Sequence, residues 1–135
     1  MKIMEKKPTF GLIVGNRGFF NEELAKQGRK DLLAKLDTLG YNYVIPPEDA
    51  TPNGAIETYA DAKICAELFR KHQDDIDGVV VVLPNFGDEL GVVHTLDMAR
   101  LNVPILIQAC DDEDPEKLLV AERRDAFCGK LSVCN

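Results

Sequence analysis

The chain has 135 residues, a formal net charge of −7, 45% hydrophobic residues and 29% charged residues. This length suits one domain with its own hydrophobic core, and the composition excludes an intrinsically disordered chain. The acidic balance and the lack of a basic tract argue against nucleic acid or an anionic membrane as a partner, and no apolar run approaches the ~20 residues that span a bilayer.

The N-terminal part of the chain predicts a strand, a helix and a second strand. Residues 9–14 form an apolar run that is typical of a buried strand. A helix is expected after Asn21, because an Asn side chain accepts hydrogen bonds from the free amides of a first helical turn. Gly28 would let this helix lie close to the sheet, and Gly40 suits its C-terminal end. Residues 41–45 predict the second strand.

A long loop and a second helix follow. Residues 46–54 are rich in Pro, Asp, Thr, Asn and Gly, which predicts a loop. The helix is expected over about residues 56–73. Its apolar residues at helical spacing form one stripe of Ala60, Ile64 and Leu68, with Cys65 and Phe69 beside it.

Two nearly continuous apolar runs, residues 78–83 and residues 104–110, flank a third helix expected at residues 88–101. Strands of this kind are covered on both faces. The pattern therefore predicts a parallel sheet with helices on each side.

The C-terminal part of the chain is expected to add a fourth helix. Residues 111–114 form an acidic loop, and Pro115 suits the first position of a helix that ends near Phe127. Residues 131–134 could then begin a fifth strand.

This order of elements predicts a single α/β domain over residues 1–135, with the doubly wound, three-layer α/β/α fold of the flavodoxin/Rossmann-like kind. The expected order of strands in the parallel sheet is 2-1-3-4, and a fifth strand is possible at the edge. Ligands bind such sheets at the carboxyl edge, where the chain reverses direction between strands one and three. The loops at residues 15–20 and 84–87 should therefore meet there.

Side chains at this edge are the candidate ligand-binding residues: Asn16, Arg17, Asn85, Phe86 and Glu89. Arg17 offers a planar fork of donors to a carboxylate, a phosphate or vicinal hydroxyls. Alternatively it is a surface arginine, or one that pairs with Asp88 or Glu89 across the crevice. Phe86 is either a flat apolar platform for a sugar ring or a partner subunit, or a loop anchor folded back on the sheet. Glu89 and its neighbour Asp88 also complement the positive end of the third helix.

The same loops argue against several other kinds of site. The glycines of residues 11–18 lack the G-x-G-x-x-G spacing, and Glu22 and Glu23 would repel a pyrophosphate at the helix start. No nucleophile, base and orienting group form a recognisable pattern, so no catalytic residue is assigned. With two histidines and no C-x-x-C pair, a metal site is not expected either.

The cysteines and the N-terminus bear on the location of the protein. Cys65 and Cys110 lie in apolar stretches and are expected to be buried thiols. The first residues carry positive charge without an apolar core behind them, which is not the pattern of a signal peptide. A reduced, cytoplasmic setting is the expectation.

Three segments carry a resemblance to a known family: residues 10–20, residues 83–89 and the closing run at residues 123–135. Through them, nearly the whole chain resembles the N-terminal region of the L-fucose isomerase and L-arabinose isomerase superfamily. Members of this superfamily are intramolecular oxidoreductases that interconvert aldoses and ketoses with a divalent metal, commonly manganese. Their metal ligands and acid–base carboxylates lie in later domains. The resemblance thus implies an N-terminal domain or fragment that binds no cofactor itself and is inactive alone.

The resemblance also implies roles for two of the candidates. In the L-fucose isomerase branch, the N-terminal domain lends an arginine and an aromatic residue to the active site of a neighbouring subunit, and the matching positions here are Arg17 and Phe86. The expected partners are therefore a monosaccharide substrate and further copies of the chain. Phe19 and Phe20 are the interface candidates, unless Phe20 tucks under the first helix. Two alternatives stay open: a free-standing flavodoxin-like small-molecule binding module, and a purely structural oligomerisation domain.

Overall fold

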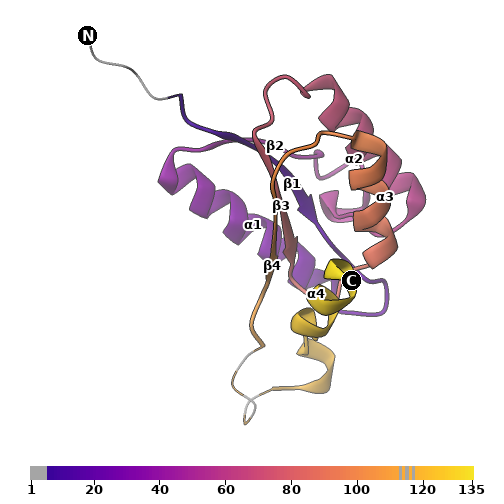
Figure 1. Ribbon diagram of the computed structural model, residues 1–135. Helices are drawn as coiled ribbons and strands as arrows, with labels where there is room; N and C mark the ends of the chain where they lie inside the picture. Colours follow the sequence, from indigo (N-terminus) through magenta and orange to yellow (C-terminus); the bar gives the residue numbers. More distant parts are fainter. Residues whose placement is uncertain (1–5, 113, 115, 117) are drawn as a thin grey trace.

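The computed structural model describes residues 6–112, 114, 116 and 118–135. A central sheet separates one helix on its first face from three helices on its second face (Figure 1). This is the three-layer α/β/α architecture that the alternation of strands and helices predicted.

The sheet contains four parallel strands in the order β2-β1-β3-β4, as predicted. Their bounds are β1 Thr9–Val14, β2 Asn42–Val44, β3 Gly78–Leu83 and β4 Ile105–Ala109. The two central strands are almost wholly buried because helices cover both of their faces. Their carboxyl ends lie at the same edge of the sheet.

The helices are α1 Glu22–Leu39, α2 Tyr59–Lys71, α3 Glu89–Ala99 and α4 Ala126–Cys134, with short 3-10 turns at Pro52–Gly54 and Val120–Glu122. Helix α1 packs on one face of the sheet, and α2, α3 and α4 pack on the other. Among the described residues, no helix is long and apolar enough to cross a membrane.

Helix α1 begins, ends and packs as the sequence predicted. The Asn21 side chain accepts a hydrogen bond from the Glu23 amide, and Gly40 closes the helix with a left-handed φ of 72°. A Cβ on Gly28 would lie 2.4 Å from Cγ of Pro84. Glycine at this position therefore lets α1 approach the end of β3.

The stripe of Ala60, Ile64 and Leu68 predicted for helix α2 is not its buried face, whereas Cys65 and Phe69, predicted beside it, are buried. The residues that face the core are Ala62, Cys65, Ala66 and Phe69, whereas Ala60 and Ile64 are exposed. The Phe69 ring decides this rotation, because it packs against Gly11 of β1, where an added Cβ would lie 3.0 Å from the ring. Two neighbouring stripes were apolar, and periodicity does not say which of them meets the sheet.

The predictions for the C-terminal part also need correction. Residues 131–134 belong to helix α4 and do not begin a fifth strand. The predicted fourth helix ending near Phe127 is replaced by the turn Val120–Glu122 and by α4, which starts at Ala126, while Pro115 lies outside the described residues. Helix α4 can dock here because Gly129 lies directly on the backbone of Phe86.

The two faces of the sheet are covered unequally. The larger apolar cluster lies under α2, α3 and α4, and the smaller one lies under α1. Beside α1 the sheet carries an open apolar trough of about 790 Å³, in which Leu106 of β4 is 62% exposed. Cys65 is buried as predicted, but Cys110 lines this trough and is only half-buried.

Candidate functional site

The loops that follow β1 and β3 meet at the carboxyl edge of the sheet, as the predicted topology requires. The Gly15 amide donates to the carbonyl of Val82 over 2.9 Å. Added Cβ atoms on Gly15 and Gly87 would lie 2.8 Å and 2.7 Å from Cδ2 of Leu83. These glycines therefore allow two loops that are some seventy positions apart to touch.

Asn85 holds the two loops together. Its side chain is completely buried. Its Oδ1 accepts hydrogen bonds from the amides of Arg17 (3.2 Å) and Gly87 (2.9 Å), and its Nδ2 donates to Oδ1 of Asn16 over 2.8 Å. Because its oxygen and its nitrogen are both engaged inside the protein, Asn85 acts on the shape of the loops.

Glu57 is a member of this network that the sequence analysis missed. Its Oε2 accepts a hydrogen bond from Nδ2 of Asn16 over 3.1 Å, and the neighbouring Ile56 bridges to Gly15. The sequence contains a pattern that could have placed Glu57. It directly precedes Thr58, which forms a capping box with Asp61 at the start of α2. Such a box fixes the residue before it, so Glu57 has a defined position beside the first loop.

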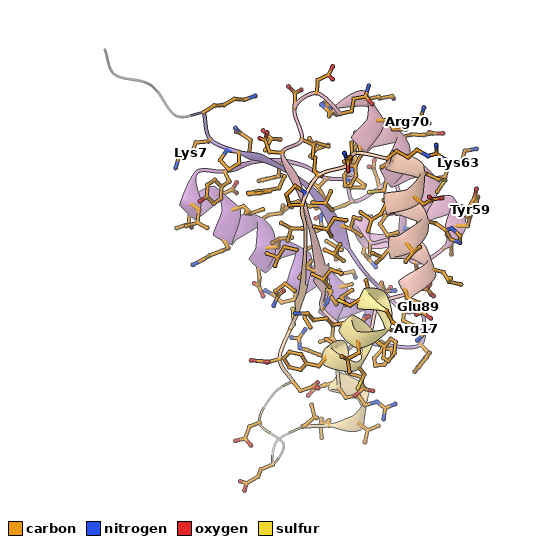
Figure 2. The ribbon with its side chains drawn as sticks, in the orientation of Figure 1. Lys7, Arg17, Tyr59, Lys63, Arg70 and Glu89 are labelled. Carbon is orange, nitrogen blue, oxygen red and sulfur yellow. The ribbon has the colours of Figure 1, made fainter. Side chains whose placement is uncertain are left out.

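Arg17 projects from this braced loop. Its guanidinium carbon lies 4.7 Å from the centre of the Phe86 ring, and its Nη2 lies 3.6 Å from Oε2 of Glu89. The side chains of Arg17 and Glu89 are 32% and 33% exposed. Figure 2 shows the two side chains close together near α4. The alternative that Arg17 pairs with an acidic residue is thus observed, and the pair remains accessible to solvent.

Phe86 is held from two sides. Its ring stacks on Phe20 with 6.2 Å between centroids, and Phe20 is almost fully buried. Behind it, a Cβ on Gly129 of α4 would lie only 1.7 Å from the Phe86 carbonyl oxygen. The ring is therefore both a loop anchor and the surface that the Arg17 guanidinium contacts. The Phe19 ring is tilted by 34° against the Phe20 ring, with 4.6 Å between centroids, and Phe19 is 76% exposed.

Glu89 stands in the first turn of α3. The turn is capped by Asp88, whose Oδ1 accepts from the amides of Leu90 (3.0 Å) and Gly91 (3.2 Å). Among the residues that the structure describes, Oε2 of Glu89 is a shielded oxygen without a hydrogen-bond donor. The Arg17 contact at 3.6 Å is longer than a hydrogen bond. The site therefore presents a cationic donor group and an anionic acceptor side by side.

The arrangement of Arg17, Phe86 and Glu89 is suited to binding a small polar molecule. The described part of the chain holds no group of three or more His, Cys, Asp or Glu side chains that could bind a metal ion. At the carboxyl edge of the sheet, the Glu89 carboxylate already faces the Arg17 guanidinium, so the residues of this site do not fit a divalent cation. The site can orient a hydroxyl-bearing molecule through donors, an acceptor and an apolar face.

Comparison with known proteins adds the family. No curated protein matches the chain. A family model described as "Fucose/sulfoquinovose isomerase, N-terminal domain" matches residues 11–135, which include both loops of the site and helix α4. The resemblance seen in the sequence is therefore confirmed at the level of the family. The chain belongs to the fucose/sulfoquinovose isomerase N-terminal domain family.

Proposed function

We propose that this domain recognises the sugar substrate, and supports subunit assembly, in a metal-dependent aldose–ketose isomerase of the L-fucose and L-arabinose isomerase type. One observation carries the proposal: the Arg17 guanidinium lies 4.7 Å from the Phe86 ring centre at the carboxyl edge of the sheet, with Glu89 beside it. Membership of the family supports an isomerase as the context. The position supports ligand binding, because parallel sheets of this topology bind ligands at that edge.

Each site residue has a distinct part in the proposed recognition. Arg17 donates hydrogen bonds to sugar hydroxyls, and Glu89 accepts from them. Phe86 positions the guanidinium and presents the part of its ring that stays exposed to the sugar. Asn16 and Asn85 position the loop that carries Arg17, because their side chains are bound to each other.

We infer that the isomerisation chemistry and the divalent metal, expected to be manganese, belong to other residues of such an enzyme. The loop-edge side chains do not fit a metal ion, for the reason given above. The isolated chain should therefore show no isomerase activity with L-fucose or L-arabinose in the presence of manganese. Turnover above the background rate would overturn this part of the proposal.

Sugar recognition is tested by a two-dimensional amide NMR titration of the chain with L-fucose. The expected shifts fall on residues 15–18 and 85–89 and on the Arg17 Nε–H. Arg17→Ala should abolish them, whereas Arg70→Ala, which removes an exposed arginine on α2 far from the site (Figure 2), should leave them intact. Equal shifts in both variants, or shifts confined to other regions, would refute the proposal.

Assembly rests on a separate observation. Phe19 leaves a large apolar ring 76% exposed directly beside the site, while Phe20 is tucked into the fold. An exposed aromatic ring next to a binding edge favours a contact between subunits. Sedimentation at several concentrations should show self-association that Phe19→Ser weakens. A strictly monomeric wild-type chain would remove assembly from the proposed role.

A further inference from the structure

Two positively charged groups lie at the carboxyl edge of the sheet, and each already faces a carboxylate of the same chain. The guanidinium of Arg17 faces Glu89 at 3.6 Å. The positive N-terminus of α3 is capped by the Asp88 side chain, which takes the Leu90 and Gly91 amides. An anionic ligand that approaches this edge therefore meets little uncompensated positive charge.

The accessible part of the Glu89 carboxylate can accept a hydrogen bond from a ligand. Its Oε2 is shielded from solvent and faces the Arg17 guanidinium, without a hydrogen-bond donor among the described residues. A hydroxyl group both donates and accepts, so it can donate to Glu89 and accept from Arg17 at the same time. The carboxylate gives up no hydrogen bond in this exchange. Because both side chains are about a third exposed, a ligand can reach the pair from solvent.

A sulfonate can accept from Arg17 but cannot donate to Glu89. Its oxygens only accept hydrogen bonds, so it cannot satisfy the Glu89 carboxylate. Binding it to Arg17 would also bring two negative charges together beside the Phe86 ring, where they repel each other.

We propose that Glu89 is a specificity-determining residue that makes this site select a neutral, hydroxyl-rich sugar and reject a sulfonated one. The inference rests on the proposed sugar recognition, and it distinguishes between the two sugars that the family description names, fucose and sulfoquinovose. The selection works through repulsion of the wrong ligand as well as attraction of the right one.

The test compares the wild-type chain with Glu89→Gln, which keeps the shape of the side chain and removes its charge. Glu67→Gln is the matched control, because it removes the same charge from an exposed position on α2. Each protein is titrated with L-fucose, sulfoquinovose and inorganic sulfate. The readouts are the NMR resonances of the Arg17 Nε–H and of the loop amides.

We expect the wild-type chain and Glu67→Gln to bind L-fucose more tightly than sulfoquinovose. Glu89→Gln should bind sulfate and sulfoquinovose about two- to fivefold more tightly than the wild type, the range typical of one exposed charge pair. Equal sulfate responses in the wild type and Glu89→Gln, including no response in either, would overturn the role of Glu89. Tighter wild-type binding of sulfoquinovose than of L-fucose would do the same. A wild-type chain whose resonances do not respond to L-fucose would instead refute the proposed function. The comparison of the sulfate titrations would still decide the role of Glu89.

Discussion

Two regions of the molecule are each built around an arginine paired with a glutamate at similar distance, yet they differ in burial. Arg17 lies 3.6 Å from Glu89, and its side chain is 32% exposed. Arg29 of α1 lies 3.8 Å from Glu48, and its side chain is only 7% exposed. The arginine of the pair is thus accessible to solvent in one region and enclosed in the other, where its partner Glu48 is 81% exposed.

Arg29 fastens the loop at residues 46–54 to helix α1. A Cβ on Gly54 would lie 2.5 Å from its Nη1, and Gly54 adopts a left-handed φ of 65° that makes room for the guanidinium. Among the described residues, Nε and Nη1 of Arg29 find no hydrogen-bond acceptor. Burial lowers the pKa of Arg29 from its usual value, and the Glu48 carboxylate opposes that shift.

Burial therefore decides what each arginine does. The enclosed Arg29 contributes packing to the framework of the loop that leads to Ile56 and Glu57. The accessible Arg17 contributes little to the framework, because an exposed ion pair stabilises a fold only weakly. It is the braced loop beneath Arg17 that carries the stability of the site region.

The largest loss of stability is expected from Gly129→Ala, which disrupts the packing of α4 against Phe86. The new Cβ would lie 1.7 Å from the Phe86 carbonyl oxygen, so α4 or the loop must move. We expect the free energy of unfolding to fall by about 3 kcal/mol. Chemical denaturation measures it, with Cys128→Ala at the preceding exposed position as the control. A loss equal to that of the control would show that α4 does not brace the loop.

Asn85→Ala should cause the second-largest loss of free energy of unfolding. It leaves the amides of Arg17 and Gly87 without their acceptor in a partly buried setting. Such orphaned groups destabilise a protein by about 2–3 kcal/mol together. Denaturation should be compared with Asn21→Ala, which removes an exposed helix cap and should cost about 1 kcal/mol. If Asn85→Ala lowered the free energy of unfolding less than Asn21→Ala, the buried hydrogen bonds of Asn85 would not be the main support of the site.

Arg29→Ala should destabilise the chain by about 1–2 kcal/mol through lost packing of its buried stem. Arg29→Met, which refills that space without a charge, should recover most of the loss, because two nitrogens of the wild-type guanidinium lack partners among the described residues. Thermal unfolding of the two variants separates packing from charge. A methionine variant as unstable as the alanine variant would show that the charge itself holds the loop.

Arg17→Ala should change the free energy of unfolding least, by about 0.5 kcal/mol or less, because its ion pair is accessible and long. The same variant should lose sugar binding, as described above. A destabilisation as large as that of Arg29→Ala would erase the contrast between the two regions and would assign Arg17 to the framework.

Local chemistry in the sequence determined much of this protein. The apolar runs at residues 9–14 and 78–83 identified the central strands, and Asn21 and Gly40 marked the ends of α1. The alternation of elements predicted the strand order and brought the two loops to one edge. These predictions succeeded because periodicity, capping and the handedness of crossovers act through neighbouring residues or through simple topology.

Long-range packing set the remaining features of the fold and of the site. The rotation of α2 depends on Phe69 meeting Gly11, and the docking of α4, to which residues 131–134 belong, depends on Gly129 meeting Phe86. The bond from Asn16 to Glu57 and the pairing of Arg17 with Glu89 likewise join residues far apart in the chain. Short apolar runs fit either a helix or a strand, and a charged side chain fits many partners, so long-range packing selects among states that are locally nearly equal in free energy.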